Sequence, residues 1–416
     1  MKLEEMIMIS VDDHAIEPRE MFVNHFPASR LGEAPRVVTT DDGQDRWIFQ
    51  GLELGAAGLN AVASWPKEEW NNDPVGYAEM RPGCYDVHDR VRDMDANGQL
   101  AGLCFPTFPG FAGTHLMNAP DKGLSNLVVS AYNDWHVEDW AGAHPGRFLP
   151  LGILPVWDVA ASVAEVHRLN ALGVRAVTFP EVPYVLGLPS FSTDHWDPVL
   201  AALNDVGMVL CFHIGGAFRL LQRPPEYSMD QHIILSPQLS AVAWTDVMVS
   251  GMLTRFPNLR IAMSEGGIGW IPFLLDRVDL HVSNQTWLGL DLGGMSGTEY
   301  FRKHFLGCFI TNPSSLFLRE RIGIEAIAWE CDYPHSDSTW PKSPEVFLDE
   351  CLKAGMDDKE IDMVSWQNAC RFFGYEPFST IERSQATVGS LRSRAKDVDT
   401  GPTSRNEFRR RFADAH

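Results

Sequence analysis

The side chains best suited to chemistry in this sequence are carboxylates and imidazoles that directly follow short apolar runs. Asp12 and His14 follow the first such run, His213 ends a later one, and Asp332 follows the last. Neutral imidazole and carboxylate oxygens are ligands for divalent metals such as Zn, Fe, Mn or Mg. We therefore predict a metal site built from these four residues.

Two further carboxylates, Glu181 and Glu265, also stand at the ends of apolar runs. With them the set holds four carboxylates, which would repel one another and partly protonate unless cations neutralised them. The density of acids therefore predicts one or two divalent transition-metal ions. Oxygen-rich ligation favours Fe or Mn and leaves Zn open.

The apolar runs that precede these ligands are expected to be strands, because longer stretches of helical period separate them. This alternation is typical of a parallel sheet. Eight runs follow this description: Met6–Val11, Leu103–Thr107, Phe148–Leu154, Val174–Phe179, Met208–His213, Arg260–Glu265, Cys308–Thr311 and Ala326–Cys331. Eight strands predict an α/β fold of the (β/α)8 TIM-barrel class, in which catalytic groups gather at the carboxyl ends of the strands.

The predicted helices include 159–172, entered by Asp158, and 198–205, which exits at Gly207. Residues 36–51 break the alternation and predict a β-hairpin around the turn Asp41-Asp42-Gly43, within an insertion of about 28–80. We expect the barrel to span residues 1–376. Residues 377–416 lose apolar period and are predicted to be an appended C-terminal arm or a solvated tail.

The composition excludes several kinds of partner. A net charge of -21 argues against nucleic acid, which is bound through clustered Lys and Arg. No apolar stretch has the length of a membrane span and no cleavage site follows the first residues, so a cytoplasmic protein without membrane contact is expected. Seven scattered cysteines without a C-x-x-C pair suit reduced thiols in the core.

The order of the ligands, with Asp-x-His on the first strand, His on the fifth and Asp on the eighth, resembles the amidohydrolase superfamily. The stretches SVDDHAIEP, CFHIGG, SEGGIGW and ECDYPHSDSTWP are similar to motifs of its amidohydrolase-2 branch, which includes aminocarboxymuconate-semialdehyde decarboxylase and related aromatic acid decarboxylases. The resemblance covers about residues 6–376. It implies a metal-dependent barrel enzyme acting on a small molecule.

The sequence departs from the superfamily at two positions. The superfamily usually opens with His-x-His and carries a His on strand six, whereas Asp12 and Glu265 stand at those places here. The role of the strand-six His in the decarboxylases, which is to position or protonate the reacting carbon, cannot be carried over to Glu265. The first functional prediction is therefore hydrolysis.

In this prediction a metal-activated water cleaves an amide, ester or thioester of an apolar or aromatic acyl substrate, and Asp332, which resembles the superfamily's catalytic base, takes the proton. The runner-up is a non-oxidative decarboxylase of an aromatic or unsaturated acid. A third hypothesis is a barrel that has lost catalysis and serves as a binding protein.

Other residues are candidates for proton transfer or substrate binding. His335, just past Asp332, is a candidate proton donor, and Arg219 is a candidate partner for an anionic substrate group. Aromatic side chains near strand ends predict an apolar pocket. They are Phe105, Phe108, Phe111 and Trp270. Related barrels commonly pair, so a homodimer is expected.

Overall fold

The computed structural model describes residues 1–41, 43–71, 76–216, 220, 224, 226 and 229–412. Two compact units make up the chain. Unit 1 comprises Met1–Val156, Cys331–Val346 and Glu376–His416, and unit 2 comprises Trp157–Glu330 and Phe347–Tyr375. Each unit is built from segments that are distant in the sequence, and each is described by itself.

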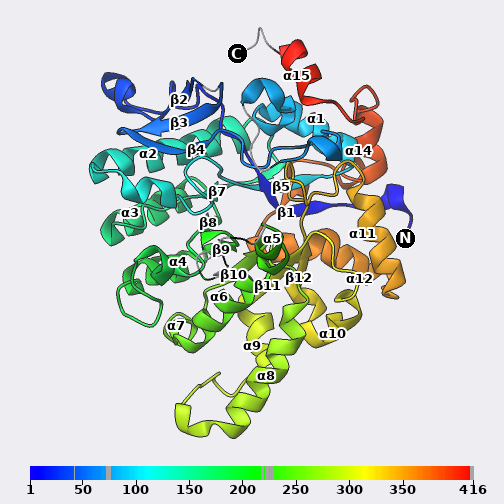
Figure 1. Cartoon of the computed structure of the whole chain (residues 1–416). Coiled ribbons are helices and arrows are strands. Elements are labelled where there is room, and N and C mark those ends of the chain that lie inside the picture. The colour runs from blue at the N-terminus through cyan, green and yellow to red at the C-terminus, as the bar shows by residue number, and fades with distance from the viewer. Residues whose placement is uncertain are drawn as a thin grey trace. The chain divides into compact units, whose positions relative to one another are not determined.

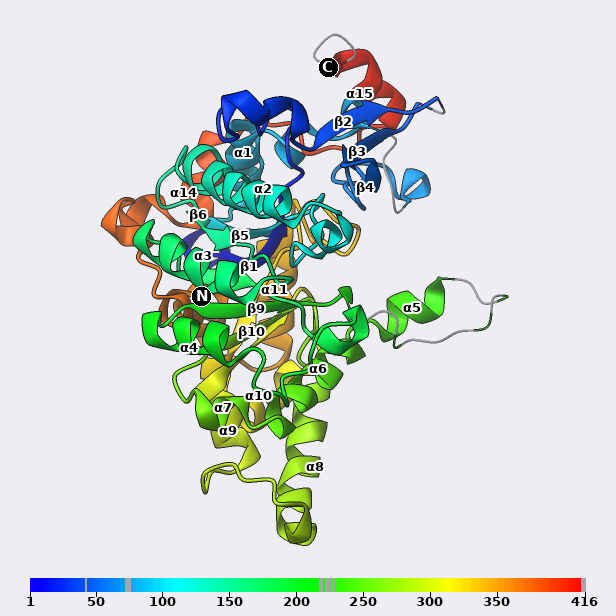
Figure 2. The same ribbon diagram turned by 90° about the vertical axis from the view of Figure 1, so that its left-hand side faces the viewer.

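Unit 1 contains three parallel strands in the order β1, β5, β6, with bounds Ile9–His14, Ala101–Phe105 and Phe148–Leu149. Strands β1 and β5 lie side by side in Figure 2. All residues of β1 and β5 are buried, as expected for parallel strands covered on both faces. The short strand β7, Leu151–Gly152, follows β6.

Unit 1 also contains α-helices, and their caps follow from the sequence. Helix α1, Val87–Asn97, begins after Asp86, whose carboxylate accepts the amides of His88 and Asp89. It ends at Gly98, where φ is +85°, a conformation that favours glycine. Other α-helices described in this unit are α2 (Lys122–Trp135), α14 (Val388–Arg394) and α15 (Arg405–Phe412). Helices α1 and α14 pack side by side (Figure 1).

A separate antiparallel sheet in unit 1 has the order β2, β3, β4, with bounds Arg36–Thr39, Asp45–Phe49 and Leu52–Ala56 (Figure 1). The predicted hairpin is confirmed, since Val37 lies opposite Trp47 in the β2–β3 pair. The third strand was not predicted. Asp42 of the predicted turn lies outside the described residues.

Unit 2 contains five parallel strands in the order β8, β9, β10, β11, β12, with bounds Ala176–Thr178, Val209–His213, Ile261–Ser264, Phe305–Phe309 and Ile327–Trp329. Its helices include α3 (Val159–Ala171), α4 (Asp197–Val206), α5 (Asp230–Leu235), α6 (Gln238–Val249), α7 (Met252–Arg255), α8 (Trp270–Asn284), α9 (Gly297–His304), α10 (Arg319–Ile322), α12 (Asp358–Asp362) and α13 (Asn368–Phe373). Helix α11 spans Ser343–Lys353. The carboxylate of Asp158 caps α3, and Gly207 ends α4 with φ +67°, as predicted.

Each of the eight predicted apolar runs contains or overlaps a strand, and helices separate these runs along the chain. The predicted α/β class, that of the (β/α)8 barrels, is confirmed. Within the described residues, no helix is both long enough and apolar enough to span a bilayer.

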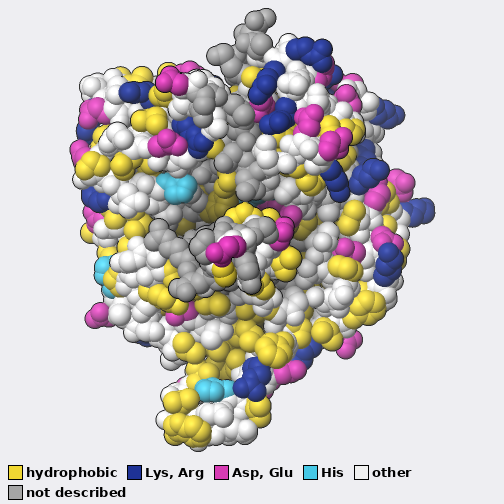
Figure 3. Space-filling view, in the orientation of Figure 1, with side chains coloured by type: hydrophobic (Ala, Val, Ile, Leu, Met, Phe, Trp, Pro, Cys, Tyr) yellow, Lys and Arg dark blue, Asp and Glu magenta, His cyan; other side chains and the backbone are white. Residues whose placement is uncertain are grey.

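The end of α8 and the turn after it carry exposed apolar side chains, which gather at one end of unit 2 in Figure 3. Trp287 is 75% exposed and Leu288 is 63% exposed. Large side chains with this exposure are common where proteins contact partners.

Candidate metal and active site

The carboxyl end of β1 is hydrogen bonded to the segment that carries Asp332. The amide of His14 donates to the carbonyl of Tyr333 at 2.7 Å, and the amide of Asp332 donates to the carbonyl of Asp12 at 2.7 Å. These two bonds fix the backbone of Asp12 and His14 against that of Asp332. The predicted ligands of unit 1 are thereby brought together by main-chain geometry.

The side chains form a buried cluster around the Asp332 carboxylate. Its Oδ1 lies 3.3 Å from His14 Nε2 and 2.9 Å from His335 Nδ1. The imidazole rings of His14 and His335 are 3.9 Å apart between centroids. Asp12 Oδ1 lies 3.7 Å from His14 Nε2. Asp12, His14 and Asp332 are fully buried and His335 is 6% exposed, so water screens these interactions little.

The electrostatics of the cluster stabilise the charge of Asp332. Burial acts to raise its pKa, but the charge of His335 and the hydrogen bonds from His14 and His335 outweigh burial and hold the pKa below its ordinary value. Asp332 also has φ +60°, a left-handed conformation in which non-glycine residues are strained. Strained residues of this kind concentrate at functional sites.

The donor set fits a divalent cation. His14, Asp332 and His335 each offer a ligand atom, and these atoms lie within 4.8 Å of one another. His335 Nε2 is buried and has no hydrogen-bond partner within the described part of the chain. Two charged imidazoles stacked this closely would repel each other, whereas neutral imidazole is a metal ligand.

The predicted ligands of unit 2 include a second imidazole and carboxylate pair. His213 Nε2 lies 3.4 Å from Glu265 Oε2. Nδ1 of His213 lies 2.6 Å from the carbonyl of Ile214, and a proton on Nδ1 would leave Nε2 as the lone-pair nitrogen. Glu265 has φ +58°, and its amide donates to the buried carboxylate of Glu330 at 3.1 Å.

Glu181 is 4% exposed and lies against Gly216, three residues after His213. A Cβ atom at Gly216 would be 2.8 Å from Glu181 Oε2, so the second glycine of CFHIGG permits this approach. Among the described residues, no group of three or more potential ligands includes Glu181 or Glu265. A centre with two metals therefore stays a prediction.

The predicted pocket residues lie in different surroundings. Phe111 and Phe105 pack near His14, with ring centroids 4.9 and 6.0 Å from the imidazole. Phe108 stacks on Trp47 at 4.4 Å. In unit 2, Trp270 packs against Trp244 at 5.9 Å and Phe301 at 6.4 Å, within a cluster of aromatic rings. Arg219 lies outside the described residues.

Two buried charged residues of unit 1 were missed by the sequence analysis. Arg90 is 1% exposed and donates to the carbonyls of His14 at 2.5 Å and Gly83 at 2.6 Å, while its guanidinium lies 4.4 Å from the ring centre of Tyr333. Arg90 therefore fixes the backbone at His14 and at Gly83. No sequence signal marks it, because it lies on an ordinary amphipathic helix.

Glu17 is the second missed residue. It is fully buried, and its carboxylate accepts the amides of Thr107 at 2.8 Å and Phe108 at 3.0 Å, which fixes the loop after β5. Burial raises the pKa of Glu17 to about 7, although these amides act to lower it. Its place three residues after His14 in a motif already singled out was a usable signal.

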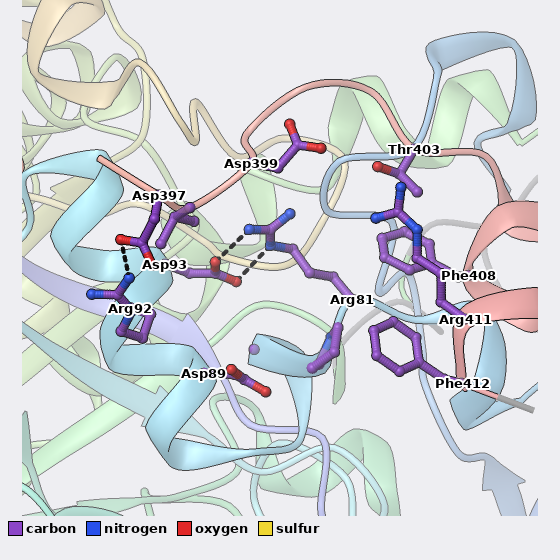
Figure 4. Close-up of a pocket in the computed structure, with 13 residues that line it drawn as sticks. Arg81, Asp89, Arg92, Asp93, Asp397, Asp399, Thr403, Phe408, Arg411 and Phe412 are labelled. Carbon is purple, nitrogen blue, oxygen red and sulfur yellow. Dashed lines mark hydrogen bonds and ion pairs between the residues drawn. The ribbon is translucent and has the colours of Figure 1, made fainter. Parts of the chain in front are cut away.

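A pocket of about 280 Å³ lies elsewhere in unit 1, where the C-terminal segment meets α1 (Figure 4). Arg81 and Asp93 form a bidentate ion pair at its wall, and Tyr333 donates to the same Asp93 at 2.7 Å. None of the predicted site residues lines it.

The family model described as amidohydrolase matches residues 25–375. The chain belongs to the amidohydrolase family. This match confirms the resemblance seen in the sequence motifs, and the mixed α/β fold with parallel strands agrees with it.

A curated relative of this amidohydrolase is 2-amino-3-carboxymuconate-6-semialdehyde decarboxylase of Dictyostelium discoideum, 22% identical over 264 residues that cover 62% of this chain and 69% of the relative. An amidohydrolase structure from Mycobacterium avium subsp. paratuberculosis superposes with a TM-score of 0.68 at 19% identity, covering 88% of this chain and 99% of the other. A dihydroxybenzoic acid decarboxylase of Polaromonas, solved with bound manganese, gives 0.57 at 17% identity and covers 90% and 98%.

Proposed function

We propose that this amidohydrolase is a metal-dependent, non-oxidative decarboxylase of an aromatic or unsaturated carboxylic acid. The observation that carries the proposal is the buried cluster in which Asp332 lies between two imidazoles, 3.3 Å from His14 and 2.9 Å from His335. The names of the Dictyostelium relative and of the Polaromonas structure support it. Decarboxylation, which was the second prediction from the sequence, is thus preferred over hydrolysis.

Asp12, His14 and Asp332 are the proposed ligands in unit 1, and manganese is the first ion to test because the Polaromonas enzyme was solved with it. A bound divalent cation would act as a Lewis acid toward the carboxylate and neighbouring hydroxyl of the substrate. His213, Glu181 and Glu265 of unit 2 remain proposed ligands. The manganese content per chain would decide whether one or two ions bind.

His335 is the proposed proton donor. Non-oxidative decarboxylation breaks the bond from carbon to carboxylate, releases carbon dioxide and needs one proton at the carbon left behind. Nδ1 of His335 lies 2.9 Å from Asp332, and Nε2 is buried without a partner in the described chain. The proposed donor is therefore the imidazolium form of His335, which would give its Nε2 proton to the carbon that loses the carboxylate and become neutral. Phe105 and Phe111 would pack against an apolar ring.

The test incubates the manganese-loaded protein with salicylate and dihydroxybenzoates, and separately with aryl esters and acyl thioesters. We expect carbon dioxide release and, in heavy water, one deuterium at the carbon that lost the carboxylate. His335→Gln should keep the metal and lose turnover by about 100-fold or more. His88→Gln, an exposed histidine on α1, is the matched control and should behave as the wild type.

Cleavage of an ester or thioester without carbon dioxide release would overturn decarboxylation in favour of hydrolysis. Metal binding without turnover of any of these substrates would favour the binding-protein hypothesis. A homodimer and a cytoplasmic location stay predictions; the exposed Trp287 and Leu288 of unit 2 are where we expect a subunit contact.

A further inference from the structure

A loop of unit 1 at residues 57–65, within the insertion after β1, has a strained backbone. Asn60 has φ +52° and Ser64 has φ +61°, and neither is glycine. Such conformations persist only where the surroundings over-determine them. The contacts between this loop and its neighbours therefore determine the loop's conformation, and through it the position of the residues that the loop contacts.

The 57–65 loop is hydrogen bonded to the backbone on both sides of His335. The amide of Val62 donates to the carbonyl of Pro334 at 3.0 Å, and Asn60 Nδ2 donates to Ser336 Oγ at 3.2 Å. Pro334 and Ser336 are the two chain neighbours of His335. The loop therefore fixes the segment from which the proposed proton donor projects.

The C-terminal segment holds the other side of this loop. The amide of Thr403 donates to the carbonyl of Ser64 at 2.7 Å. Phe408 of α15 is 3% exposed and forms a small apolar cluster with Val62 and Trp65. Figure 4 shows Thr403 and Phe408 on this segment, together with Phe412, which packs at the edge of the same cluster.

Charged side chains of α15 add to the attachment. Arg409 forms an ion pair with Glu79, a carboxylate only 2% exposed. The indole of Trp65 donates to the carbonyl of the same Glu79 at 2.9 Å. The guanidinium of Arg405 lies 5.3 Å from the ring centre of Trp65. An apolar anchor thus fastens α15 to the 57–65 loop, and a partly exposed ion pair fastens it to Glu79, whose carbonyl accepts the indole of Trp65.

We infer that the segment 403–412 is a positioning element of the active site, and that it acts on His335 through the 57–65 loop. Phe408 and Arg409 are positioning residues, since neither contacts the metal ligands. The inference rests on the proposed function only for the role given to His335. It assigns a catalytic consequence to a segment that the sequence analysis treated as an arm or tail.

The test compares Phe408→Leu, Phe408→Ala and Arg409→Gln in the full chain with Arg410→Gln as the matched control. Arg410 lies on the same helix, is 75% exposed at its side chain and contacts Glu407 and the carbonyl of Asn406, both of that helix. The first readout is amide hydrogen exchange in residues 331–338, which needs neither metal nor substrate. We expect faster exchange there in Phe408→Ala and Arg409→Gln, and wild-type exchange in Arg410→Gln.

The second readout is kinetic. Because His335 is displaced while the substrate contacts remain, kcat should fall about tenfold with KM little changed, as for other residues that orient a site group. Arg409→Lys should restore most of the loss by keeping the charge next to Glu79, and Phe408→Leu should do so by keeping the apolar anchor.

A lower melting temperature with unchanged exchange in residues 331–338 would overturn the inference, because the segment would then act on stability alone. Faster exchange with unchanged kcat would also overturn it. If the wild type turns over no acid, the proposed function fails, yet the exchange experiment still decides whether α15 holds the His335 segment.

Discussion

Replacement of Asp332 separates the metal chemistry of the site from its backbone strain. Asp332 has φ +60°, and asparagine is one of the few residues that tolerate this conformation, whereas alanine does not. Asp332→Asn therefore keeps the backbone and the shape of the side chain but removes the charge that lies 3.3 Å from His14 and 2.9 Å from His335. Asp332→Ala removes the charge and adds strain.

Loss of the charge and backbone strain affect two different quantities, the affinity for manganese and the stability of the metal-free protein. Loss of a charged ligand should weaken manganese binding by about 100-fold or more, which corresponds to about 2.7 kcal/mol. Strain should make Asp332→Ala less stable than Asp332→Asn by about 1 kcal/mol. Titration of manganese into the chelator-treated protein measures the first quantity, and melting temperatures of the metal-free variants measure the second.

The matched control is Asp349→Asn, which removes an exposed carboxylate that pairs with Lys353 on α11. It should bind manganese as the wild type does. Wild-type manganese affinity or turnover in Asp332→Asn would remove Asp332 from the site. Equal melting temperatures for the asparagine and alanine variants would show that the positive φ costs nothing, which would refute the argument from strain.

Further predictions concern the residues around the cluster and the metal itself. Arg90→Met leaves the carbonyls of His14 and Gly83 without their buried donor. We therefore expect thermal unfolding to show a loss of about 2–4 kcal/mol of stability, together with weaker manganese binding. Unchanged stability and unchanged manganese affinity would contradict the positioning role of Arg90. Because burial raises the pKa of Glu17 from 4.5 to about 7, the folded state holds a proton that the unfolded state releases, and this contribution to stability is lost as the pH rises from 4.5 through 7. The stability advantage of the wild type over Glu17→Gln should therefore shrink by about 2 kcal/mol between pH 5.5 and pH 8, and an advantage that grows with pH would refute the assignment. Chelation should abolish turnover and lower the melting temperature, and manganese at about 100 times its Kd should restore about 2.7 kcal/mol of stability. Full activity in a metal-free sample would refute the metal site.

The strands could be predicted because their signal is local. Buried parallel strands are continuous apolar runs, and those ending at His213 and Glu265 were placed to within a few residues. The caps at Asp158 and Gly207 were likewise readable, since capping depends on residue type at one position. The third strand of the antiparallel sheet was missed because Leu52–Ala56 is short and contains a glycine.

What the sequence could not reveal are the buried charges that meet through the fold. Glu330 accepts the amide of Glu265, 65 residues away, and Arg90 reaches His14, 76 residues away. Arg90 stands in no pattern that marks it as buried, and charged residues are ordinarily exposed. Glu330 does lie in the predicted strand 326–331, but the sequence did not indicate which group it would contact. The positive φ of Glu265 and Asp332 was equally hidden, because residue type alone does not indicate a left-handed backbone at an acid.

The charge balance around Asp332 also changes how the number of metals should be argued. In the sequence, four carboxylates near one another predicted one or two cations. In unit 1, the imidazoles of His14 and His335 already stabilise the charge of Asp332, as its lowered pKa indicates. Counting acids without their imidazole partners therefore overstates the need for a second metal. Under the proposed function, a single cation next to an imidazole that can supply a proton would be enough for loss of carbon dioxide, and the manganese content per chain would measure whether one or two ions bind.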